Sequence, residues 1–538
     1  MNYFFRQVLT MLHILAILLF ASTAAIDWYQ RILATGLDFP LGPDPTLWGK
    51  ASLLAQANAP QTIPPTFPIL SSILSFSDSL VLGVYRVNSL GIFLSIVGSS
   101  IGVFFLLERT WSGVFASWGC AILCAYSLYW TPYIFYFQPE CLVLGVFSLV
   151  CLSTIWVVQS HKKHPSYRSL LLWGASVGLL FGTREHGIVV LLSILPTILI
   201  ASHRRTRTMV LFCIGLQIGG SVASGAPTQP FFFPHGGPNG TITKASVAVR
   251  DSMVLVQGGQ NSTWLPNLDM AQIKLSGGVK KENPTDKSFL EFMTTQALKI
   301  GQDFIPSIGV AFLGLLGIIY RHGWRKGMFI STTFSPLLAA LVVWTQWRHF
   351  FVLSSIFPIL ACGGILLFFP KKIRFLGSFV VLGMSLSIYK QWSPYLNNYF
   401  DITVRREGNK ASKNKSKVVI ADYLRTSTPD GSVVIADETI AILSKKPPIK
   451  LHQRELYSSR FPIWPNFIYR SYLVASRSPG ANWESVQTFS KTTNQVFRHK
   501  RPEGISEKCL YGYWNGPIVE NIPNDLERPQ PKDVCADQ

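Results

Sequence analysis

The sequence predicts an α-helical polytopic membrane protein with about eleven transmembrane helices and a small extracytoplasmic α/β domain at its C-terminal end. Of its 538 residues, 48% are hydrophobic and only 14% are charged, whereas about a quarter of an ordinary soluble protein is charged. The apolar residues fall in runs of roughly 17 to 25, long enough to cross a hydrocarbon core of about 30 Å as a helix. They lack the alternation of barrel strands, so we expect helical spans.

The hydrophobic runs place the spans in order along the first part of the chain. They cover residues 8–26, 84–107, 113–130, 140–159, 170–183, 188–202, 209–225, 305–320, 328–345, 350–369 and 375–391. Four short loops between them are basic, through Lys162, Lys163 and Arg168; Arg204, Arg205 and Arg207; Arg321, Arg325 and Lys326; and Lys371, Lys372 and Arg374. The positive-inside rule makes all four loops cytoplasmic if the N-terminus is inside.

The same alternation predicts three longer segments on the extracytoplasmic side, 27–83, 226–304 and 392–538. The basic clusters lie in the short loops between spans, where membrane topology explains them, so the net charge of +20 does not require a nucleic-acid partner. The first span, with Arg6 and "ASTAA", also has the pattern of a cleavable signal peptide, and both interpretations stay open. Either way the first long segment lies outside.

Composition divides the chain into four parts. Residues 1–392 form the predicted transmembrane domain, 393–411 a linker, 412–514 a small extracytoplasmic α/β domain, and 515–538 a Pro- and charge-rich disordered tail. In the third part, "SKVVIADYLRTSTPDGSVVIADETIAIL" reads as a helix, a turn, a strand at Val433 to Ala436 and a helix, and "FIYRSYLVAS" reads as another strand. This part contains no catalytic motif of its own.

The eight cysteines show no metal-ligand spacing. Six of them lie in predicted spans, where Cys is expected to behave as a small buried apolar residue. Cys509 and Cys535 lie in the external tail. They either form one disulfide or remain two thiols.

Two carboxylates, Asp38 and Asp44, follow the first span in "TGLDFPLGPDPTLWGKASLL". A carboxylate beside a bilayer is unfavourable unless it faces water, a cation or a substrate, so acids in a structured loop indicate a functional site. The alternative is local structure, because Asp is favoured in turns beside Pro and Gly, and Asp44 is placed as a helix N-cap.

The surrounding stretches point to a family. After the acids come an amphipathic "DPTLWGKASLLAQA", a Pro-rich "PPTFPILSSILSF" and "YRVNSLGIFLSIVG". Further along stand "YFQPECLVLG", "GLLFGTREHGIVVLL" and "WTQWRHFFVLSSIFPILACGGILL". Together these blocks resemble GT-C glycosyltransferases, multi-span enzymes that use lipid-linked sugars, in particular the bacterial branch similar to protein O-mannosyltransferases and aminoarabinose transferases. The resemblance covers about residues 8–392, and a small α/β domain after the last span is common in that branch.

The resemblance implies transfer of a sugar from a polyprenyl phosphate to an acceptor hydroxyl, with inversion at the anomeric carbon. Asp44 is the candidate general base and Asp38 the reserve, since an ionised carboxylate can accept the hydroxyl proton. Arg184 and Arg348 are predicted to reach the same external boundary, where a guanidinium suits a lipid phosphate. Their alternative is snorkelling at helix ends.

Three further residues are candidates to orient the acceptor or to bind a metal: Glu140, His186 and His349. Glu140 could equally be an acid placed at a helix N-terminus, where the helix dipole favours it. Each histidine could equally be hydrogen-bonded at the interface without binding any ligand. No metal is assigned, and use of a divalent metal stays open.

The chain departs from the family pattern in three places. The family often has an acidic pair at the first loop, whereas here Pro45 follows Asp44; Arg348 and His349 stand where Arg-Tyr is usual; and Arg184, Glu185 and His186 stand where a lysine is common. Sugar, acceptor and metal use are therefore not carried over.

The sequence thus predicts a multi-pass enzyme of the bacterial inner membrane with its active site on the extracytoplasmic side. Its expected partners are a polyprenyl-phosphate-linked sugar, a lipid, glycan or protein acceptor, and membrane lipid. The alternative is a polytopic transporter or lipid flippase without glycosyl transfer, which would be expected to have ionisable residues deep in the spans and internal repeats. A third interpretation is a membrane anchor whose function lies in the tail.

Overall fold

A computed structural model describes the fold of most of the predicted membrane domain and part of the tail. The described residues are 3–34, 70, 73–74, 80–126, 134, 140–159, 166–183, 186–202, 204–224, 309–336, 353–429, 432–436, 440, 444, 471–478, 480–481, 483–489 and 494–500. Cys509, Cys535 and the predicted tail 515–538 lie outside these residues.

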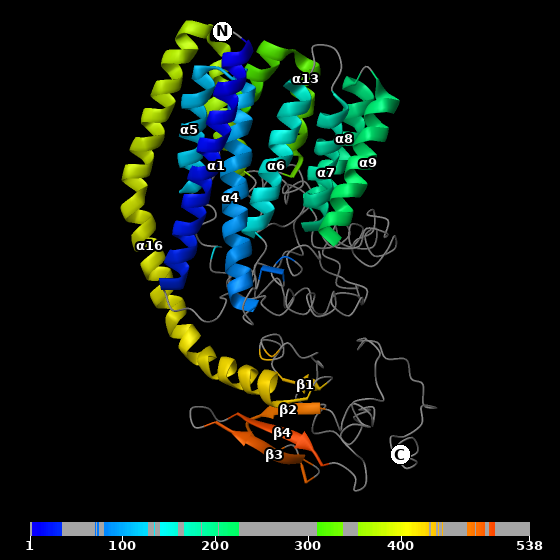
Figure 1. Cartoon of the computed structure of the whole chain (residues 1–538), viewed down its shortest axis with the longest axis vertical. Coiled ribbons are helices and arrows are strands. Elements are labelled where there is room, and N and C mark those ends of the chain that lie inside the picture. Colours follow the sequence, from blue (N-terminus) through cyan, green and yellow to red (C-terminus); the bar gives the residue numbers. More distant parts are fainter. Residues whose placement is uncertain are drawn as a thin grey trace, which may run out of the picture.

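The first part of the chain is a helical bundle (Figure 1). Its helices are α1 (Tyr3–Ala34), α4 (Leu80–Leu106), α5 (Trp111–Ala125), α6 (Glu140–Gln159), α7 (Tyr167–Thr183), α8 (His186–Ala201), α9 (Arg205–Ser224), α13 (Trp324–Ser331), α15 (Leu353–Ile359) and α16 (Lys371–Ser427). An apolar helix Gly309–His322 precedes α13. After α15 come a π-helical turn, η5 (Leu360–Gly364), and a 3₁₀ turn, η6 (Ile365–Phe368).

Five helices in the described part of the chain are long and apolar enough to cross a membrane: Phe4–Ala34, Leu82–Leu106, Glu140–Gln159, Arg205–Ala223 and Lys371–Gln391. Four shorter helices are also apolar. Large apolar side chains such as Leu12, Val222 and Leu376 are exposed on the outside of the bundle, which is favourable in lipid and not in water. The chain is therefore an integral membrane protein. Every predicted span overlaps one of the described helices, and the number of spans remains a prediction.

Helices α4 and α6 run side by side in the same direction, at backbone contact. A Cβ added to Gly91 would collide with the carbonyl group of Cys141, and one added to Gly98 would come within 2.7 Å of the carbonyl carbon of Ser148. Small residues permit such close approach, and close packing associates helices where lipid removes the hydrophobic driving force.

Helices α7 and α9 pack in the same way. Gly215 and Gly219 of α9 lie against the backbone of Leu171 and Ala175 of α7.

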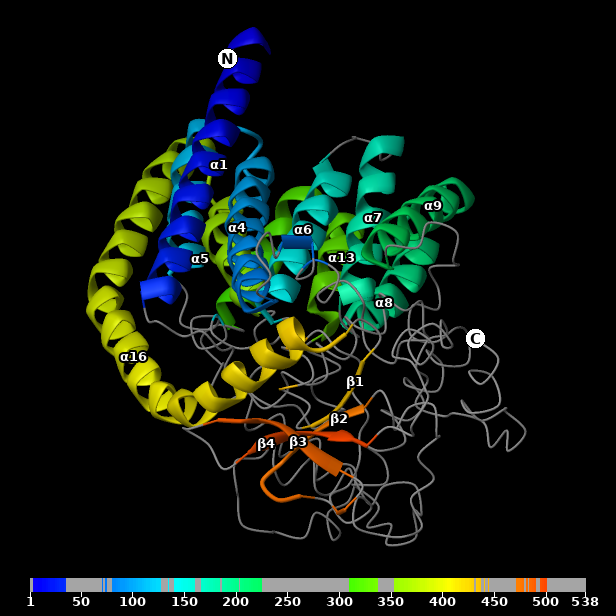
Figure 2. The same ribbon diagram turned by 60° about the horizontal axis from the view of Figure 1, so that its bottom comes forward.

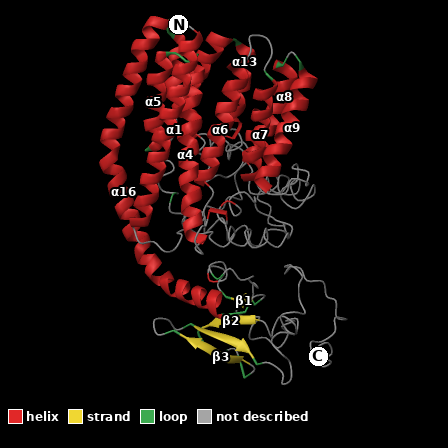
Figure 3. Ribbon diagram, viewed as in Figure 1, coloured by secondary structure: helices red, strands yellow, loops and turns green. Residues whose placement is uncertain are grey.

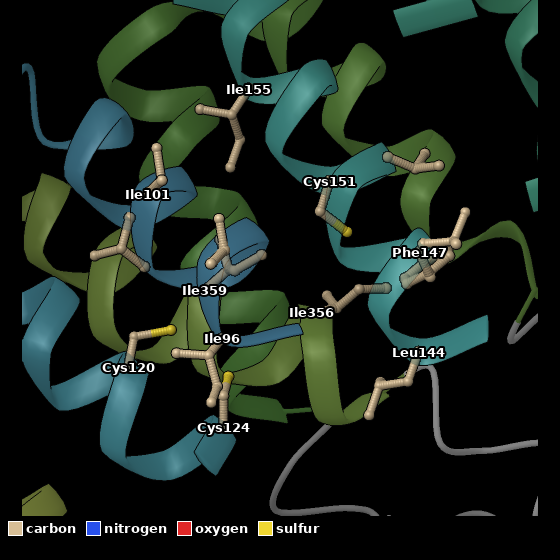
Figure 4. Packing of buried hydrophobic residues seen from close by; sticks show 14 of the residues in the cluster. Ile96, Ile101, Cys120, Cys124, Leu144, Phe147, Cys151, Ile155, Ile356 and Ile359 are labelled. Carbon is tan, nitrogen blue, oxygen red and sulfur yellow. The ribbon is translucent and has the colours of Figure 1, made fainter. Parts of the chain in front are cut away.

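Figure 4 shows part of the apolar core, where side chains of α4, α5, α6 and α15 meet. All six cysteines of the predicted spans are free in the structure, and five of them are buried.

Helix α1 is built into the bundle by polar contacts as well as apolar ones. The Nε1 atom of Trp28 donates to the carbonyl of Ala125 at 3.1 Å. The Nε2 atom of His13 lies 2.6 Å from the Oγ atom of Ser117 on α5. These contacts join α1 to α5 within the bundle.

Helix α16 is 57 residues long and leads from the bundle to a small sheet (Figures 1 and 2). It includes the last predicted span, the whole of the predicted linker 393–411 and the first predicted helix of the tail. Near its end, Ile420 and Leu424 pack against Val434, Tyr472 and Val496 of the sheet. This apolar contact stabilises the polar end of the helix.

The sheet has four strands in the order β1-β2-β4-β3 (Figure 1). Figure 3 shows these strands in yellow beyond the end of the long helix α16. They are β1 (Val433–Ile435), β2 (Ser471–Ala475), β3 (Trp483–Thr488) and β4 (Gln495–His499). Strands β1 and β2 are parallel, and the other two pairs are antiparallel. The first two strands fall within the stretches that the sequence analysis predicted as strands. The residues after β1 that were predicted to form a helix lie mostly outside the described residues.

Candidate active site

The bundle has two chemically different ends. At the end that carries the N-terminus, α4 turns into α5, α8 into α9, and η6 into α16 (Figure 1). The described residues of the predicted basic loops lie at two of these turns, at the start of α7, and at the junction before and within α13: Arg204, Arg205, Arg207, Lys371, Lys372 and Arg374; Arg168; and Arg321, Arg325 and Lys326. We call this the basic end. The opposite end, where α6 begins, is called the Glu140 end.

Most of the candidate side chains lie outside the described residues. This is the case for Asp38, Asp44, Arg184, Arg348 and His349, while His186 is described only as the first residue of α8. Their nearest described neighbours nevertheless lie at the same end of the bundle. Figure 1 shows that α1 ends, α6 and α8 begin, and α7 ends at the Glu140 end.

These helix ends stand close to the candidates in the sequence. Ala34 ends α1 shortly before Asp38, and Thr183 ends α7 directly before Arg184. Leu353 begins α15 shortly after Arg348 and His349. The described chain therefore carries segments from distant parts of the sequence toward the same end of the bundle.

Glu140 is the one candidate whose side chain is described. It lies in the first turn of α6 and is only 3% exposed. The partial positive charge of a helix N-terminus stabilises a carboxylate at this position. Burial of such a group is unfavourable in itself, so its presence here is compatible with both interpretations, a helix-terminal acid and a site residue.

Two polar side chains of α4 organise the same end, and the sequence analysis gave them no role. The amide nitrogen of Asn88, a fully buried residue, donates to the carbonyl of Ile134 at 2.9 Å. The guanidinium of Arg86 donates to the carbonyl of Leu74 at 2.6 Å. Thus α4 is tied to one described residue of the first predicted external segment and to one that precedes α6.

The contact between α4 and α6 brings these groups toward Glu140. Gly91, one turn from Asn88 along α4, lies against the backbone of Cys141, which follows Glu140. The signal in the sequence was present in "YRVNSLGIFLSIVG", where an Arg and an Asn interrupt an apolar run. Polar residues at such positions are candidates for a function, but their acceptors are backbone carbonyls, which carry no sequence signature.

No group of three or more His, Cys, Asp or Glu side chains that could hold a metal ion occurs among the residues that the structure describes. Glu140 is therefore not part of a metal cluster built from described residues alone. His186 and His349 remain untested as ligands, because their side chains are not among those described.

Comparison with known proteins finds no matching family profile and no matching curated sequence. Solved structures do resemble the chain. ArnT from Cupriavidus metallidurans bound to undecaprenyl phosphate is 14% identical, with a TM-score of 0.48 over 89% of this chain and 97% of ArnT. The Archaeoglobus fulgidus oligosaccharyltransferase, in complex with Zn and sulfate, is 14% identical, with a TM-score of 0.44 over 80% of this chain. The chain spans 62% of the length of that oligosaccharyltransferase.

Proposed function

We propose that this protein is an integral-membrane glycosyltransferase of the GT-C type, which transfers a sugar from a polyprenyl-phosphate donor to an extracytoplasmic acceptor. One observation carries the proposal. The described helix ends that flank the candidate residues converge on the Glu140 end, opposite the basic end. By the positive-inside rule the basic end faces the cytoplasm, which puts the candidates on the extracytoplasmic side.

The proposed reaction is a single displacement at the anomeric carbon of the donor sugar. The acceptor hydroxyl oxygen forms a bond to that carbon as the bond between the carbon and the phosphate oxygen breaks. Asp44 takes the hydroxyl proton, with Asp38 as the alternative base, and the polyprenyl phosphate leaves with the electron pair of the broken bond. The configuration at the anomeric carbon is inverted because attack and departure occur on opposite faces.

Arg184 and Arg348 are proposed to hold the departing phosphate. Negative charge develops on the leaving oxygen in the transition state, and pre-placed cations lower the free energy of that state. A guanidinium can also donate two parallel hydrogen bonds to phosphate oxygens. Glu140, His186 and His349 are proposed to orient the acceptor, with Arg86 and Asn88 as positioning residues that hold the neighbouring backbone.

The bundle also supports a site built at a membrane boundary. It provides apolar helices for a membrane site and brings Glu140 to one of its ends. A transporter would be expected to carry ionisable residues deep in its helices. Among the described charged side chains, those of the predicted loops instead lie at the basic end, and Arg86 and Glu140 lie near the start of their helices at the Glu140 end.

Mass spectrometry of cell-envelope glycans, with and without the protein, tests the proposal. We expect one sugar to be missing from a glycan or glycolipid when the protein is absent, which would identify donor and acceptor together. Unchanged glycans in both samples would overturn the proposal and favour a transporter or an anchor.

A substitution of Asp44 then tests whether this residue is the general base. Asp44→Asn should insert and fold normally but transfer about 10² to 10⁴ times more slowly, because general-base assistance contributes about that much. Asp422→Asn is the matched control, since Asp422 is exposed on α16 and pairs with Arg425. Near-normal transfer by Asp44→Asn would make Asp44 a turn or cap residue, and Asp38→Asn would then be expected to show the loss.

A further inference from the structure

Five ionisable residues gather at the basic end, away from the proposed active site. Glu108 comes from the turn between α4 and α5, Arg321, His322 and Lys326 from the junction before and within α13, and Arg374 from the first turn of α16. The Nη2 atom of Arg321 lies 3.6 Å from the Oε1 atom of Glu108. We call these five residues the Glu108 cluster.

The Glu108 cluster holds more positive than negative charge. Burial, and after it the neighbouring Lys326, lowers the pKa of His322 to about 4, so this imidazole is neutral at neutral pH. The three cations Arg321, Lys326 and Arg374 then outnumber the one carboxylate of the cluster. Arg374 lies close enough to both Arg321 and Glu108 to interact with them electrostatically.

The geometry of the Glu108 cluster is fixed by the backbone around it. Arg374 is buried and donates to the carbonyls of Leu366 at 3.2 Å and Phe369 at 3.1 Å. Glu108 and Arg109 both adopt left-handed backbone angles, with φ of 60° and 55°. Residues other than glycine rarely take such angles, and they gather at functional sites when they do.

An exposed apolar surface adjoins the charges. Tyr320 is 73% exposed and Ile373 is 53% exposed, and each lies next to a cation of the Glu108 cluster in the sequence. The ring of Tyr320 packs on that of Phe368 with centroids 5.8 Å apart, and Phe368 and Phe369 are also exposed. Aromatic side chains are enriched at membrane interfaces, where one face contacts lipid tails and the other meets head groups.

We propose that the Glu108 cluster binds the phosphate of an anionic phospholipid of the adjoining leaflet, with an acyl chain lying over Tyr320, Phe368 and Ile373. Glu108 neutralises only part of the positive charge of the cluster. Arg321 and Lys326 supply the remaining positive charge, which attracts the phosphate. Arg374 adds to the positive field without leaving its carbonyl partners. Basic pockets between transmembrane helices are suited to anionic lipid head groups.

The exposed apolar surface favours a phospholipid over other ligands of the same charge. A soluble phosphate would use the cations alone and gain nothing from exposed aromatic rings. A phospholipid uses both, because its head group and acyl chain are joined. The site therefore combines the two features that recognition of an anionic lipid needs.

Native mass spectrometry of the full chain in phosphatidylcholine nanodiscs containing a minority of phosphatidylglycerol tests the proposal. The test variant is Arg321→Gln combined with Lys326→Gln. The control is Arg204→Gln with Arg207→Gln, which removes the same charge from exposed positions at the same end. We expect the test variant to retain phosphatidylglycerol about tenfold less well and the control to retain it nearly normally.

Equal loss in both variants, or loss in neither, would overturn the proposal. Displacement of the lipid by inorganic phosphate alone would also overturn it, because the site would then recognise an anion and not a lipid. If the double variant does not fold, Tyr320→Ser serves instead, since Tyr320 is exposed and its loss removes apolar contact without removing charge. Unchanged retention by Tyr320→Ser would contradict the acyl-chain part of the proposal.

Discussion

Gly91 of α4 and Gly145 of α6 lie face to face, and a Cβ added to residue 145 would collide with the carbonyl oxygen of Gly91. No side-chain rearrangement can relieve that collision, because the obstacle is backbone. The same contact places the first turn of α6, with Glu140, beside the turn of α4 that carries Asn88. The pair therefore links the packing of the bundle to the proposed site.

Gly145→Ala should lower the stability of the protein by about 1 to 3 kcal/mol, the usual effect of overpacking, or prevent folding. Gly383→Ala is the matched control, because a Cβ added to Gly383 of α16 meets no atom within 4 Å. Thermal unfolding of both purified variants in the same detergent measures the difference. Equal unfolding midpoints would show that α4 and α6 do not approach as closely as described.

Much of the bundle could be predicted from hydropathy alone. The predicted span 140–159 coincides with α6 (Glu140–Gln159), because an apolar run bounded by polar residues is a strong signal. The last predicted span, 375–391, captures only part of α16 (Lys371–Ser427). The apolar run ends where the side chains become polar, whereas the helix continues and meets the sheet through Ile420 and Leu424. That contact forms only in the folded protein, so no local sequence pattern predicts it.

The candidate site was less accessible to sequence reasoning than the fold. Glu140 could be recognised in the sequence because it stands at the start of a long apolar run. The roles of Arg86 and Asn88 were not, because each depends on which carbonyl lies opposite once the chain has folded. The assignments of Asp38 and Asp44 depend on a family resemblance, and they stay predictions.

His13 and Ser117 form a polar contact between α1 and α5 that should hold the first helix in place. The two side chains are 2.6 Å apart and buried. A double-mutant cycle with His13→Phe and Ser117→Ala should give a coupling free energy of about 0.6 kcal/mol, and at most about 1.7, as for other hydrogen bonds between membrane helices. Additive effects of the two changes would mean that the contact contributes nothing of its own.

His322 should make the protein less stable in mild acid. Its pKa is about 4 in the folded protein, below the ordinary 6.5, through burial first and then the nearby Lys326. Its Nε2 atom is buried and has no hydrogen-bond partner among the described residues. Between these two pKa values the unfolded chain binds a proton that the folded chain does not, so stability falls as the pH drops from about 6.5 toward about 4.

Thermal unfolding of wild type and His322→Gln across that range isolates this contribution. We expect the difference between the two proteins to be constant above about pH 7, and the wild type to lose more stability than the variant below about pH 6. Carboxylates also titrate in this range, but they do so in both proteins and cancel in the difference. Parallel curves down to about pH 4 would contradict the lowered pKa of His322.

Arg184 and Arg348 distinguish an enzyme that handles a lipid phosphate from a protein with charged helix ends. Arg184 follows α7 directly, and Arg348 stands shortly before α15. If both hold the donor phosphate, Arg→Lys at either position should weaken donor binding, because an ammonium keeps the charge but loses the two-pronged geometry. If they only snorkel, Lys should substitute freely, since either side chain can carry its charge to the interface. Arg204→Lys, at the opposite basic end, is the control and should bind the donor normally. Binding of a polyprenyl-phosphate sugar to folded protein measures the effect, and normal affinity in both variants would remove these two arginines from the proposed donor site.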